Sequence, residues 1–394
     1  MDPTREPMIR LDDLTKQYPG RTVAVDHLTL DVADGELVVL VGPSGCGKTT
    51  TMKMINRLIE PTSGRIILDG EDVTRVDPVR LRRRIGYVIQ QVGLFPHRSV
   101  ADNIGTVPSL LGWDRKRIRD RVGELLELVG LEPSYGKRYP YELSGGQRQR
   151  VGVARALAAD PPVLLMDEPF GAVDPIARDR LQLEFLRLQS AVRKTVVFVT
   201  HDIEEAVRLG DRIAVMRQGG RLEQYDTPAA ILGAPGTDFV AEFVGADRGL
   251  KRLSVTRISP ADIVHPPVVS VDDTLAAARA ALDGASARWA VVLDANDRLH
   301  GWLAREQADG DGDVHSRGHR MDAWVAVDAS LKVAFGEMLQ HDAGWIAVLD
   351  GERYVGVLTP SSLHGALRRS VEADAGGSRA EDVVLETAGE PVIH

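Results

Sequence analysis

Residues Gly42–Thr50 read GPSGCGKTT and set the architecture of the first half of this chain. The segment follows the apolar run Leu37–Val41 and precedes Met52–Leu58, where we expect a helix to begin. A strand that leads through a glycine-rich turn into a helix is typical of a phosphate-binding loop, because backbone N–H groups and the helix N-terminus then face the anion. A chance glycine-rich turn is the alternative, and the full G-x4-G-K-T spacing argues against it.

The same loop predicts the contacts to a nucleoside triphosphate. Gly42 and Gly47 leave room for the backbone to approach phosphates, Lys48 can reach the β- and γ-phosphates, and the Thr49 hydroxyl can coordinate Mg²⁺. The predicted nucleotide-binding residues of the loop are Gly42, Pro43, Ser44, Gly45, Cys46, Gly47, Lys48, Thr49 and Thr50. Cys46 is the only cysteine of the chain, which excludes an internal disulfide and fits a reducing compartment.

Length and charge narrow the class of protein. A chain of 394 residues is long enough for two or more domains, and 43% hydrophobic with 27% charged residues is an ordinary globular composition. The formal net charge of −9 argues against nucleic acid as the main partner. The first ten residues, MDPTREPMIR, lack the apolar core of a signal peptide, and no run approaches the roughly 18 apolar residues of a membrane span. We therefore expect a soluble protein that can still dock on a membrane partner.

Apolar runs alternate with helical patterns through the first 245 residues. Met8–Asp31 predicts a small antiparallel sheet, whereas Asp114–Val129 and Leu143–Ala158 predict helices. Further strands are predicted at Gly64–Leu68, Arg84–Gln90, Val163–Met166, Thr195–Val199 and Arg212–Met216. This alternation indicates an α/β domain with a largely parallel sheet, in which ligands collect at the carboxyl ends of the strands. Four polar or turn residues are expected at that edge, namely Gly42, Gln90, Asp167 and His201.

Asp167, Glu168, Gln90 and His201 are candidates for the chemistry. Asp167 can hold Mg²⁺ directly or through water, and Glu168 can act as the general base that polarises an attacking water. The Gln90 amide can touch both metal and water, and His201 can contact the γ-phosphate. Helix-capping carboxylates are the alternative for Asp167 and Glu168, which the phosphate loop disfavours. A solvated glutamine and a structural histidine stay open as alternatives for Gln90 and His201. The predicted metal ligands are Thr49, Gln90 and Asp167, and the predicted catalytic residues are Glu168, His201, Gln90 and Lys48.

Taken together, these residues resemble the ATP-binding cassette (ABC) ATPases over Met8–Gly245. The matching motifs are the adenine-stacking aromatic Tyr18, the Walker A loop Gly42–Thr49, the Q-loop Gln90, the LSGGQ signature Leu143–Gln147, Walker B and its glutamate in Val163–Pro169, the D-loop Gly171–Asp174 and the switch His201. The resemblance implies a mixed sheet with a helical subdomain and an antiparallel β subdomain, and it implies Mg²⁺ and ATP as ligands.

The resemblance also implies partners. Ser144, Gly145 and Gly146 open a helix and offer N–H groups to an anion, and in the family they complete the site of a second copy, so Ser144, Gly145, Gly146, Gln147 and Asp174 join the predicted ATP contacts. The implied unit is two cassettes, head to tail, around two ATP. The segment Val92–Tyr139 resembles the helical subdomain that grips membrane permease subunits. Coupling-helix contacts are expected at Gln91, Leu94, Phe95 and Pro96, with burial in the core as the alternative.

The second half contains an internal repeat. Leu275 and Leu331, like Trp289 and Trp345, are separated by 56 residues (331 − 275 and 345 − 289), and each copy predicts strand, helix, strand, turn and strand. The paired copies resemble a tandem of cystathionine β-synthase (CBS) domains, an α+β regulatory module. We predict a cassette at 8–245, a linker at 246–254, the CBS pair at 255–370 with repeats at about 255–310 and 318–370, and an acidic disordered tail at 371–394.

A cassette followed by a CBS pair resembles the ATP-binding subunit of glycine betaine/proline betaine importers. This implies a quaternary-amine osmoprotectant as cargo (glycine betaine, proline betaine, carnitine or choline), a substrate-binding protein acting indirectly, and a location at the cytoplasmic face of the membrane. In such importers the CBS pair is a gate that senses ionic strength or binds cyclic di-AMP. Both copies, Gly301–Gln307 and Gly356–Ser362, lack the aspartate of the family's G-x-x-[TS]-x-x-D nucleotide motif. A purely structural, dimerising role is the alternative.

Other interpretations remain open on the sequence. Arg248, Lys251 and Arg252 of the linker can meet anionic lipid, or can simply be solvated. The chain could instead serve another ABC importer, for example of amino acids. A non-transport ABC regulator acting on DNA or ribosomes is opposed by the negative charge, and a sensor without turnover is opposed by Glu168 and His201.

Overall fold

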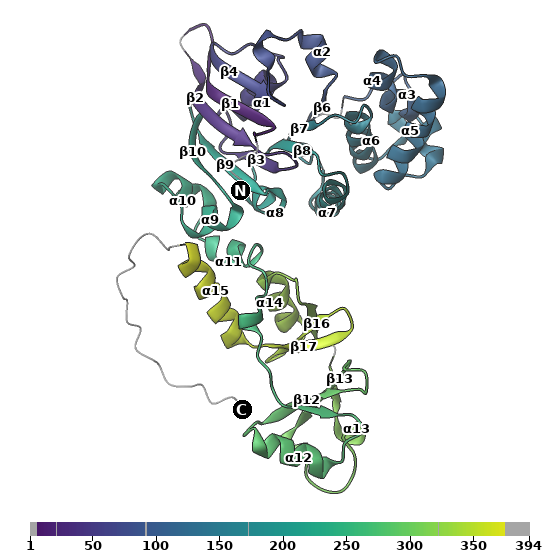
Figure 1. The fold of residues 1–394 in the computed structure, drawn as a ribbon, viewed down its shortest axis with the longest axis vertical. Helices are drawn as coiled ribbons and strands as arrows, with labels where there is room; N and C mark the ends of the chain where they lie inside the picture. The colour runs from purple at the N-terminus through teal and green to yellow at the C-terminus, as the bar shows by residue number, and fades with distance from the viewer. Residues whose placement is uncertain (1–5, 21, 91–92, 172, 322, 375–394) are drawn as a thin grey trace. The chain divides into compact units, whose positions relative to one another are not determined.

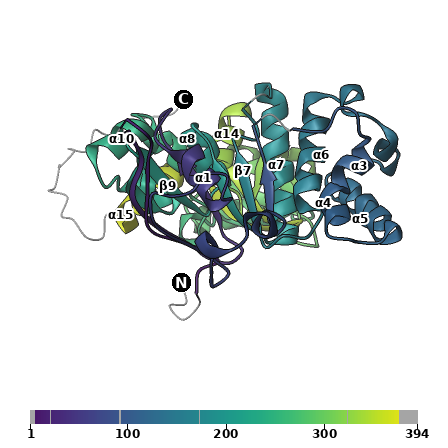
Figure 2. The ribbon, with the colours of Figure 1, turned by 90° about the horizontal axis from the view of Figure 1, so that it is seen from above.

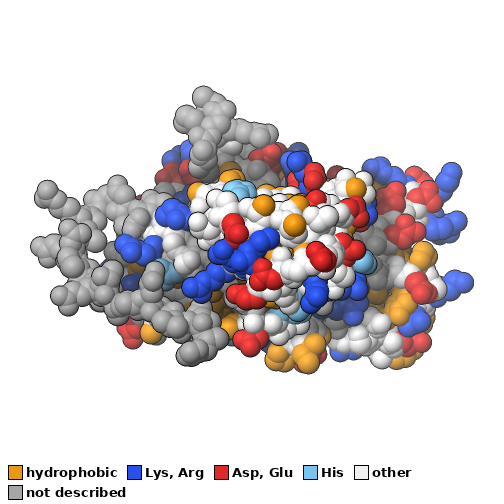
Figure 3. Space-filling view, turned by 90° about the horizontal axis from the view of Figure 1, so that it is seen from below, with side chains coloured by type: hydrophobic (Ala, Val, Ile, Leu, Met, Phe, Trp, Pro, Cys, Tyr) orange, Lys and Arg blue, Asp and Glu red, His pale blue; other side chains and the backbone are white. Residues whose placement is uncertain are grey.

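The computed structural model describes residues 6–20, 22–90, 93–171, 173–321 and 323–374, and the chain forms two compact units, 1–247 and 248–394 (Figure 1). Gln91 of the predicted coupling contacts lies outside the described residues. Among the helices that are described, none is both long enough and apolar enough to span a bilayer. In the view of Figure 3, acidic and basic side chains are interleaved rather than gathered by sign, which is the pattern of a solvated surface.

The first unit is built on a six-stranded sheet with the order β10-β9-β3-β8-β7-β6. Its strands are β3 (Leu37–Val41), β6 (Ile85–Val88), β7 (Val163–Asp167), β8 (Thr195–Val199), β9 (Arg212–Arg217) and β10 (Arg221–Asp226). The ladders from β9 to β6 are parallel and β10 is antiparallel to β9, so the predicted mixed sheet is confirmed. Every residue of β3 and β8 is buried, because helices cover both faces, which explains their uninterrupted apolar sequence.

A second sheet confirms the predicted antiparallel β region. Its order is β2-β1-β4-β5, with β1 (Ile9–Gln17), β2 (Val23–Val32), β4 (Ser63–Leu68) and β5 (Glu71–Asp72). Helix α1 (Lys48–Ile55) follows β3, and its Met52, Met54 and Ile55 share one core with apolar residues of both sheets. This shared core fixes the start of α1 relative to the strand ends. The short helix α2 (Pro78–Arg82) precedes β6.

The helical region lies at one end of the first unit, where α3, α4 and α5 stay together in both ribbon views (Figures 1 and 2). It comprises α3 (Val100–Ile104), α4 (Thr106–Leu110), α5 (Arg115–Leu128), the 3₁₀ helices η2 (Pro133–Lys137) and η3 (Pro140–Glu142), and α6 (Gly145–Leu157). The predicted amphipathic helix is α5, which buries Val122, Leu125 and Leu126 and is capped by Asp114. The unit is completed by α7 (Pro175–Val192), α8 (Ile203–Leu209), α9 (Pro228–Gly233) and α10 (Asp238–Val244).

The second unit repeats one pattern twice. The first copy contains β11 (Val268–Ser270), α12 (Leu275–Gly284), β12 (Trp289–Leu293) and β13 (Leu299–Ala304), and the second contains β15 (Trp324–Ala326), α14 (Leu331–Gln340), β16 (Ile346–Asp350) and β17 (Arg353–Leu358). In both copies the first strand is parallel to the second, and the second is antiparallel to the third. Helix α13 (Val314–Arg317) and strand β14 (His319–Arg320) join the copies, and α15 (Pro360–Asp374) follows.

The two copies share an interface in which their matching tryptophans stack. The rings of Trp289 and Trp345 are 4.2 Å apart between centroids and 5° from parallel. Val291, Leu293 and Val357 are buried in the same cluster. Each copy therefore buries apolar surface against the other, as expected for repeats too small to stand alone.

Two boundary predictions differ from the structure. Helix α11 (Arg248–Leu253) fills most of the predicted linker, and the Arg252 side chain is only 2% exposed, with Nε donating to Ser370 Oγ at 2.7 Å. Arg252 is therefore part of the packing of the second unit rather than a solvated contact for lipid, because its long stem is buried where the sequence showed only a charge. Helix α15 continues to Asp374, so the first four residues of the predicted disordered tail are helical, and 375–394 lie outside the described residues.

Candidate active site

The glycine-rich loop is held in a shape that only glycine allows at two positions. Gly47 caps α1 with φ 96°, and a Cβ there would lie 2.2 Å from the Ala24 carbonyl oxygen. A Cβ on Gly42 would lie 2.1 Å from the Met216 carbonyl oxygen. The loop therefore wraps closely around the N-terminus of α1, whose first-turn N–H groups lack intrahelical acceptors and are available to an anion.

The Lys48 side chain folds back into the loop and hydrogen-bonds its backbone. Its side chain is 6% exposed, and Nζ donates to the carbonyl oxygens of Gly42 at 2.7 Å and Pro43 at 3.0 Å. The carbonyl oxygens of Gly42 and Pro43 thereby hold the Lys48 Nζ inside the loop. The arrangement fits a phosphate chain, because an anion would meet both the ammonium and the helix N-terminus.

Two of the predicted metal ligands, Thr49 and Asp167, lie in direct contact. The Thr49 hydroxyl donates to Asp167 Oδ1 at 3.1 Å. Burial raises the pKa of the Asp167 carboxyl above its usual value, and the hydrogen bond from Thr49 partly offsets this rise. Among the described residues, no cluster of three or more His, Cys, Asp or Glu could hold a metal ion alone. One carboxylate and one hydroxyl suit Mg²⁺ that is completed by phosphate oxygens and water.

The Glu168 carboxylate contacts two side chains, Gln90 and His201. Gln90 Nε2 donates to Glu168 Oε2 at 3.1 Å, and His201 Nδ1 lies 3.2 Å from Glu168 Oε1. The three side chains follow β6, β7 and β8, so the parallel sheet brings them to one edge. Glu168 has φ 44°, a left-handed conformation that is strained for a non-glycine residue and that persists where the surroundings fix it. Gln90 thus contacts the predicted base, and among the described residues it forms no hydrogen bond with the other two predicted metal ligands, Thr49 and Asp167.

The signature segment forms a separate cavity. Ser144 caps α6, and its hydroxyl oxygen accepts from Gln147 N–H at 3.2 Å while Ser144 N–H donates to Gln147 Oε1 at 2.9 Å. Gly145, Gly146 and Asp174 line the same cavity of about 540 Å³, to which no residue of the loop Gly42–Thr50 contributes. Within one chain, the signature and the phosphate loop are thus different sites.

Tyr18 and Asp174 occupy exposed positions compatible with their predicted roles. The Tyr18 ring follows β1 and is 39% exposed, with Lys16 Nζ 5.2 Å from its centroid, so one ring face can take a planar base. Asp174 caps α7, where its Oδ1 accepts from Ala177 N–H at 3.0 Å.

Arg155 links the signature helix to the segment after Gln90, and the sequence alone did not indicate this contact. It lies on α6, the signature helix, and its Nη1 donates to the Gly93 carbonyl oxygen at 2.6 Å, just beyond the Q-loop glutamine. Burial lowers the pKa of the Arg155 guanidinium. An arginine inside the apolar run VGVARALA was the available signal, because a charge in such a run needs a specific partner.

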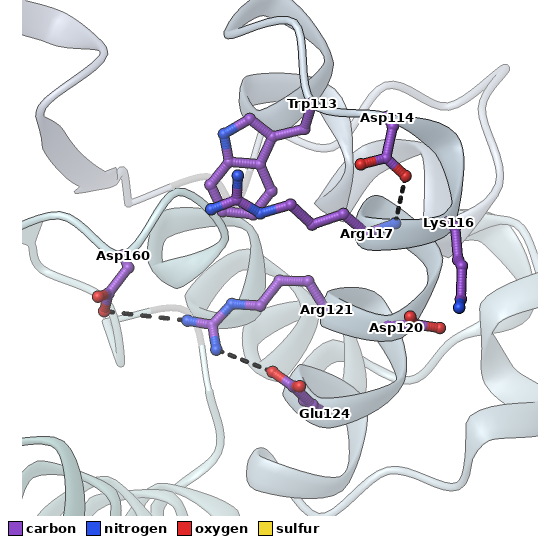
Figure 4. Close-up of a pocket in the computed structure, with 8 residues that line it drawn as sticks. All are labelled: Trp113, Asp114, Lys116, Arg117, Asp120, Arg121, Glu124 and Asp160. Carbon is purple, nitrogen blue, oxygen red and sulfur yellow. Dashed lines mark hydrogen bonds and ion pairs between the residues drawn. The ribbon is translucent and has the colours of Figure 1, made fainter.

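A cavity of about 530 Å³ on α5 belongs to a different part of the unit (Figure 4). The Arg117 guanidinium lies 3.6 Å from the Trp113 ring centroid, and Arg121 contacts Glu124 at 3.1 Å and Asp160 at 4.0 Å. Arg121 is thus paired with two carboxylates of the cavity wall, and none of the lining residues was singled out by the motifs.

Replacing Asp167 by asparagine is expected to raise the melting temperature of the nucleotide-free protein while lowering Mg²⁺-dependent turnover by at least about 10²-fold. The folded-state pKa is raised, so the ionised carboxyl opposes folding once the pH exceeds its unfolded value of about 3.9. The stabilisation should therefore be absent near pH 3 and grow toward pH 7. Calorimetry across this range checks the sign, and a variant equally or less stable than the parent at pH 7 would refute it.

Comparisons with known proteins agree with this geometry. The ABC transporter family matches residues 25–171. The glycine betaine/carnitine/choline transport ATP-binding protein OpuCA of Bacillus subtilis is 45% identical over 93% of this chain and 98% of its own length. The osmoprotectant import ATP-binding protein OsmV of Salmonella typhimurium is 45% identical over 89% of this chain and 94% of its own.

Solved structures extend the likeness to the fold of the first unit. The dimeric, post-hydrolysis ATP-binding cassette MJ0796 with ADP and Pi is 34% identical, with a TM-score of 0.51, over 56% of this chain and 99% of that one. The cassette cbiO1 of Clostridium perfringens is 27% identical, with a TM-score of 0.55, over 59% and 93%. The loop, the sheet edge and the full-length relatives agree, and the chain belongs to the ABC transporter family as an ATP-binding protein.

Proposed function

We propose that this chain is the ATP-hydrolysing subunit of an importer for quaternary-amine osmoprotectants such as glycine betaine, proline betaine, carnitine or choline. The observation that carries the ATPase proposal is Glu168, which is held between Gln90 and His201 beside the Thr49–Asp167 pair. The names of the relatives OpuCA and OsmV support the cargo class, since they align along the second unit as well as the first.

Each group has a defined task in hydrolysis. Lys48 and the first-turn N–H groups of α1 would bind the phosphates, and Thr49 with Asp167 would hold Mg²⁺, whose charge would offset that of the phosphates. Glu168 accepts the proton of the attacking water. His201 and Gln90 each contact one oxygen of the Glu168 carboxylate, and together they would fix its orientation for proton transfer.

Two copies acting together account for the separate signature cavity. Ser144, Gly145, Gly146 and Gln147 of one copy would contact ATP held by the loop of the other, with Asp174 beside them. ATP then joins the copies, and loss of its terminal phosphate releases them, which is a ligand-driven rigid-body switch. The dimeric state of the similar cassette MJ0796 supports this arrangement.

The helical region is the proposed contact with the membrane permease. Phe95 is 41% exposed and follows the Q-loop, and Pro96 beside it is also exposed, whereas Leu94 is half-buried. Phe95 lies two residues after Gly93, and Arg155 links Gly93 to α6. A coupling helix that packs on Phe95 would therefore shift this segment after Gln90 together with α6. With this contact, we propose that the chain lies at the cytoplasmic face of the membrane and that the permease lies between it and the substrate-binding protein.

For the second unit we propose a CBS pair that gates transport in response to ionic strength or a cyclic dinucleotide such as cyclic di-AMP. The stacked tryptophans join its two copies. Binding of ATP or AMP is disfavoured, since Thr359 Oγ1 already accepts from Ser362 N–H at 3.1 Å and contacts the Ser361 hydroxyl at 2.9 Å. Arg248 remains an exposed candidate for anionic lipid, whereas Arg252 is excluded by its burial.

The proposal is tested in vesicles that contain this chain, its permease and its substrate-binding protein. Labelled glycine betaine should accumulate only with ATP on the side of this chain, and not when Lys48→Ala replaces the parent. Raising the salt on that side should change the rate if the second unit is an ionic-strength gate. ATP-dependent uptake of amino acids without uptake of any quaternary amine would assign the chain to another importer, and hydrolysis without uptake of either would refute the transport proposal.

A further inference from the structure

Tyr135 reaches the signature segment through its hydroxyl group. Gln147 Nε2 donates to Tyr135 Oη at 3.2 Å, and both residues line the signature cavity. The phosphate-loop motifs do not include Tyr135, which lies on the 3₁₀ helix η2 before the signature begins.

Tyr135 is itself firmly placed. Its N–H donates to the Glu132 carbonyl oxygen at 2.9 Å, and its own carbonyl accepts from Arg138 N–H at 3.0 Å. The Arg138 guanidinium lies 3.8 Å from the Tyr135 ring centroid, a distance at which a cation is attracted to the ring face. Gly136 beside it is buried. The hydroxyl is therefore a fixed point against which a flexible side chain can be held.

The hydrogen bond fixes which way the Gln147 amide faces. Its oxygen accepts from Ser144 N–H, and its nitrogen donates to Tyr135. If the amide turned over, its NH₂ group would face the Ser144 N–H, donor against donor. Tyr135 thus restrains the torsion that keeps the cap of α6 formed.

The cap determines what the signature offers to an anion. The Ser144 hydroxyl oxygen is occupied as acceptor for Gln147 N–H, so the hydroxyl proton is left to donate outward. The N–H groups of Gly145 and Gly146 lie in the first turn of α6, where no intrahelical acceptor exists. If Gln147 lost its hydrogen bond to Tyr135, the Ser144 hydroxyl and the Gly145 and Gly146 N–H groups would adopt several orientations instead of one.

We propose that Tyr135 is a positioning residue for ATP binding across the interface, acting through Gln147 on the signature donors that contact the nucleotide held by the partner copy. This inference rests on the proposed two-copy arrangement. It assigns the effect of Tyr135 to the site across the interface, and not to the phosphate loop of its own chain.

Mixed dimers of the full chain separate these two possibilities. In a Glu168→Gln background, one copy carries Lys48→Ala, so only its partner keeps an intact loop. Tyr135→Phe is then placed either on the Lys48→Ala copy, whose signature faces the intact loop, or on the partner. We expect about three- to tenfold weaker retention of Mg·ATP in the first arrangement, the usual worth of one hydrogen bond, and no change in the second. A structural defect of the variant would weaken both equally and overturn the proposal.

Two controls complete the design. Tyr141→Phe removes a hydroxyl from a side chain that is 75% exposed, and it should leave retention unchanged in both arrangements. In a Gln147→Ala background, Tyr135→Phe should have no further effect, because the residue acts through Gln147; an undiminished effect would contradict the inference. If dimers with intact Tyr135 retain no Mg·ATP, the proposed function fails first, and that outcome is recognisable without the variant.

Discussion

Replacing Glu168 by glutamine is expected to lower ATP turnover by about 10²–10⁴-fold while Mg·ATP still binds. Glutamine keeps the length of the side chain and one oxygen for the Gln90 amide, 3.1 Å away in the parent, but it cannot take a proton from water. Binding should persist, because Lys48 and the N-terminus of α1, rather than Glu168, are the groups we propose to hold the phosphates. Phosphate release by the purified transporter measures turnover, and a fluorescent ATP analogue measures binding.

The matched control is Glu204→Gln, which changes an exposed carboxylate on the neighbouring helix α8. Its turnover should stay within about twofold of the parent, as for most surface substitutions. An unchanged rate in the Glu168 variant would end the assignment of Glu168 as the general base. Loss of binding with loss of turnover would mean that Glu168 shapes the site rather than moves a proton.

Replacing Lys48 by alanine is expected to weaken Mg·ATP binding by about 10- to 100-fold, the worth of a hydrogen bond from a charged donor. The Lys48 ammonium is the charged donor inside the loop, and its removal leaves the carbonyls of Gly42 and Pro43 without their partner. Turnover should fall at least as far as binding. Equilibrium binding of the fluorescent analogue gives the dissociation constant.

Lys53→Ala is the control for charge alone, since Lys53 lies exposed on the same helix. It should change the dissociation constant by no more than about twofold, because exposed charges are screened by solvent. A Lys48→Ala variant that binds as tightly as the parent, with the circular dichroism of the folded protein, would remove Lys48 from the phosphate site.

Much of the fold was predictable because local patterns agreed with tertiary structure. The fully apolar runs of β3 and β8 predicted strands buried on both faces, and the order of strands and helices predicted the parallel ladder between them. The repeat spacing predicted the matching strands of the second unit, but the stacking of Trp289 on Trp345 depends on how the two copies meet. The periodicity of apolar residues predicts each helix or strand separately, and it does not predict which side chains of two elements come into contact.

The sequence predicted that these side chains would lie at one edge of the sheet, but not which of them would contact each other. Asp167 and Thr49 lie in contact, as expected, whereas Gln90 contacts Glu168. These contacts depend on how the ends of three strands lie at one edge of the sheet, which the sequence does not show. The left-handed backbone of Glu168 could not be predicted, because a sequence indicates this conformation mainly where it places a glycine. Arg252 was expected either to meet anionic lipid or to be solvated, and it is buried instead, because the sequence of a short charged segment does not show which helices pack against it.

The account rests on two copies that share each ATP, and a resolved structure of the Glu168→Gln chain saturated with Mg·ATP tests it most directly. It predicts that the terminal phosphate contacts Lys48 and Thr49 of one copy and Ser144, Gly145 and Gly146 of the other. A nucleotide bound by the loop while the signature segments of both copies remain distant from it would contradict the account.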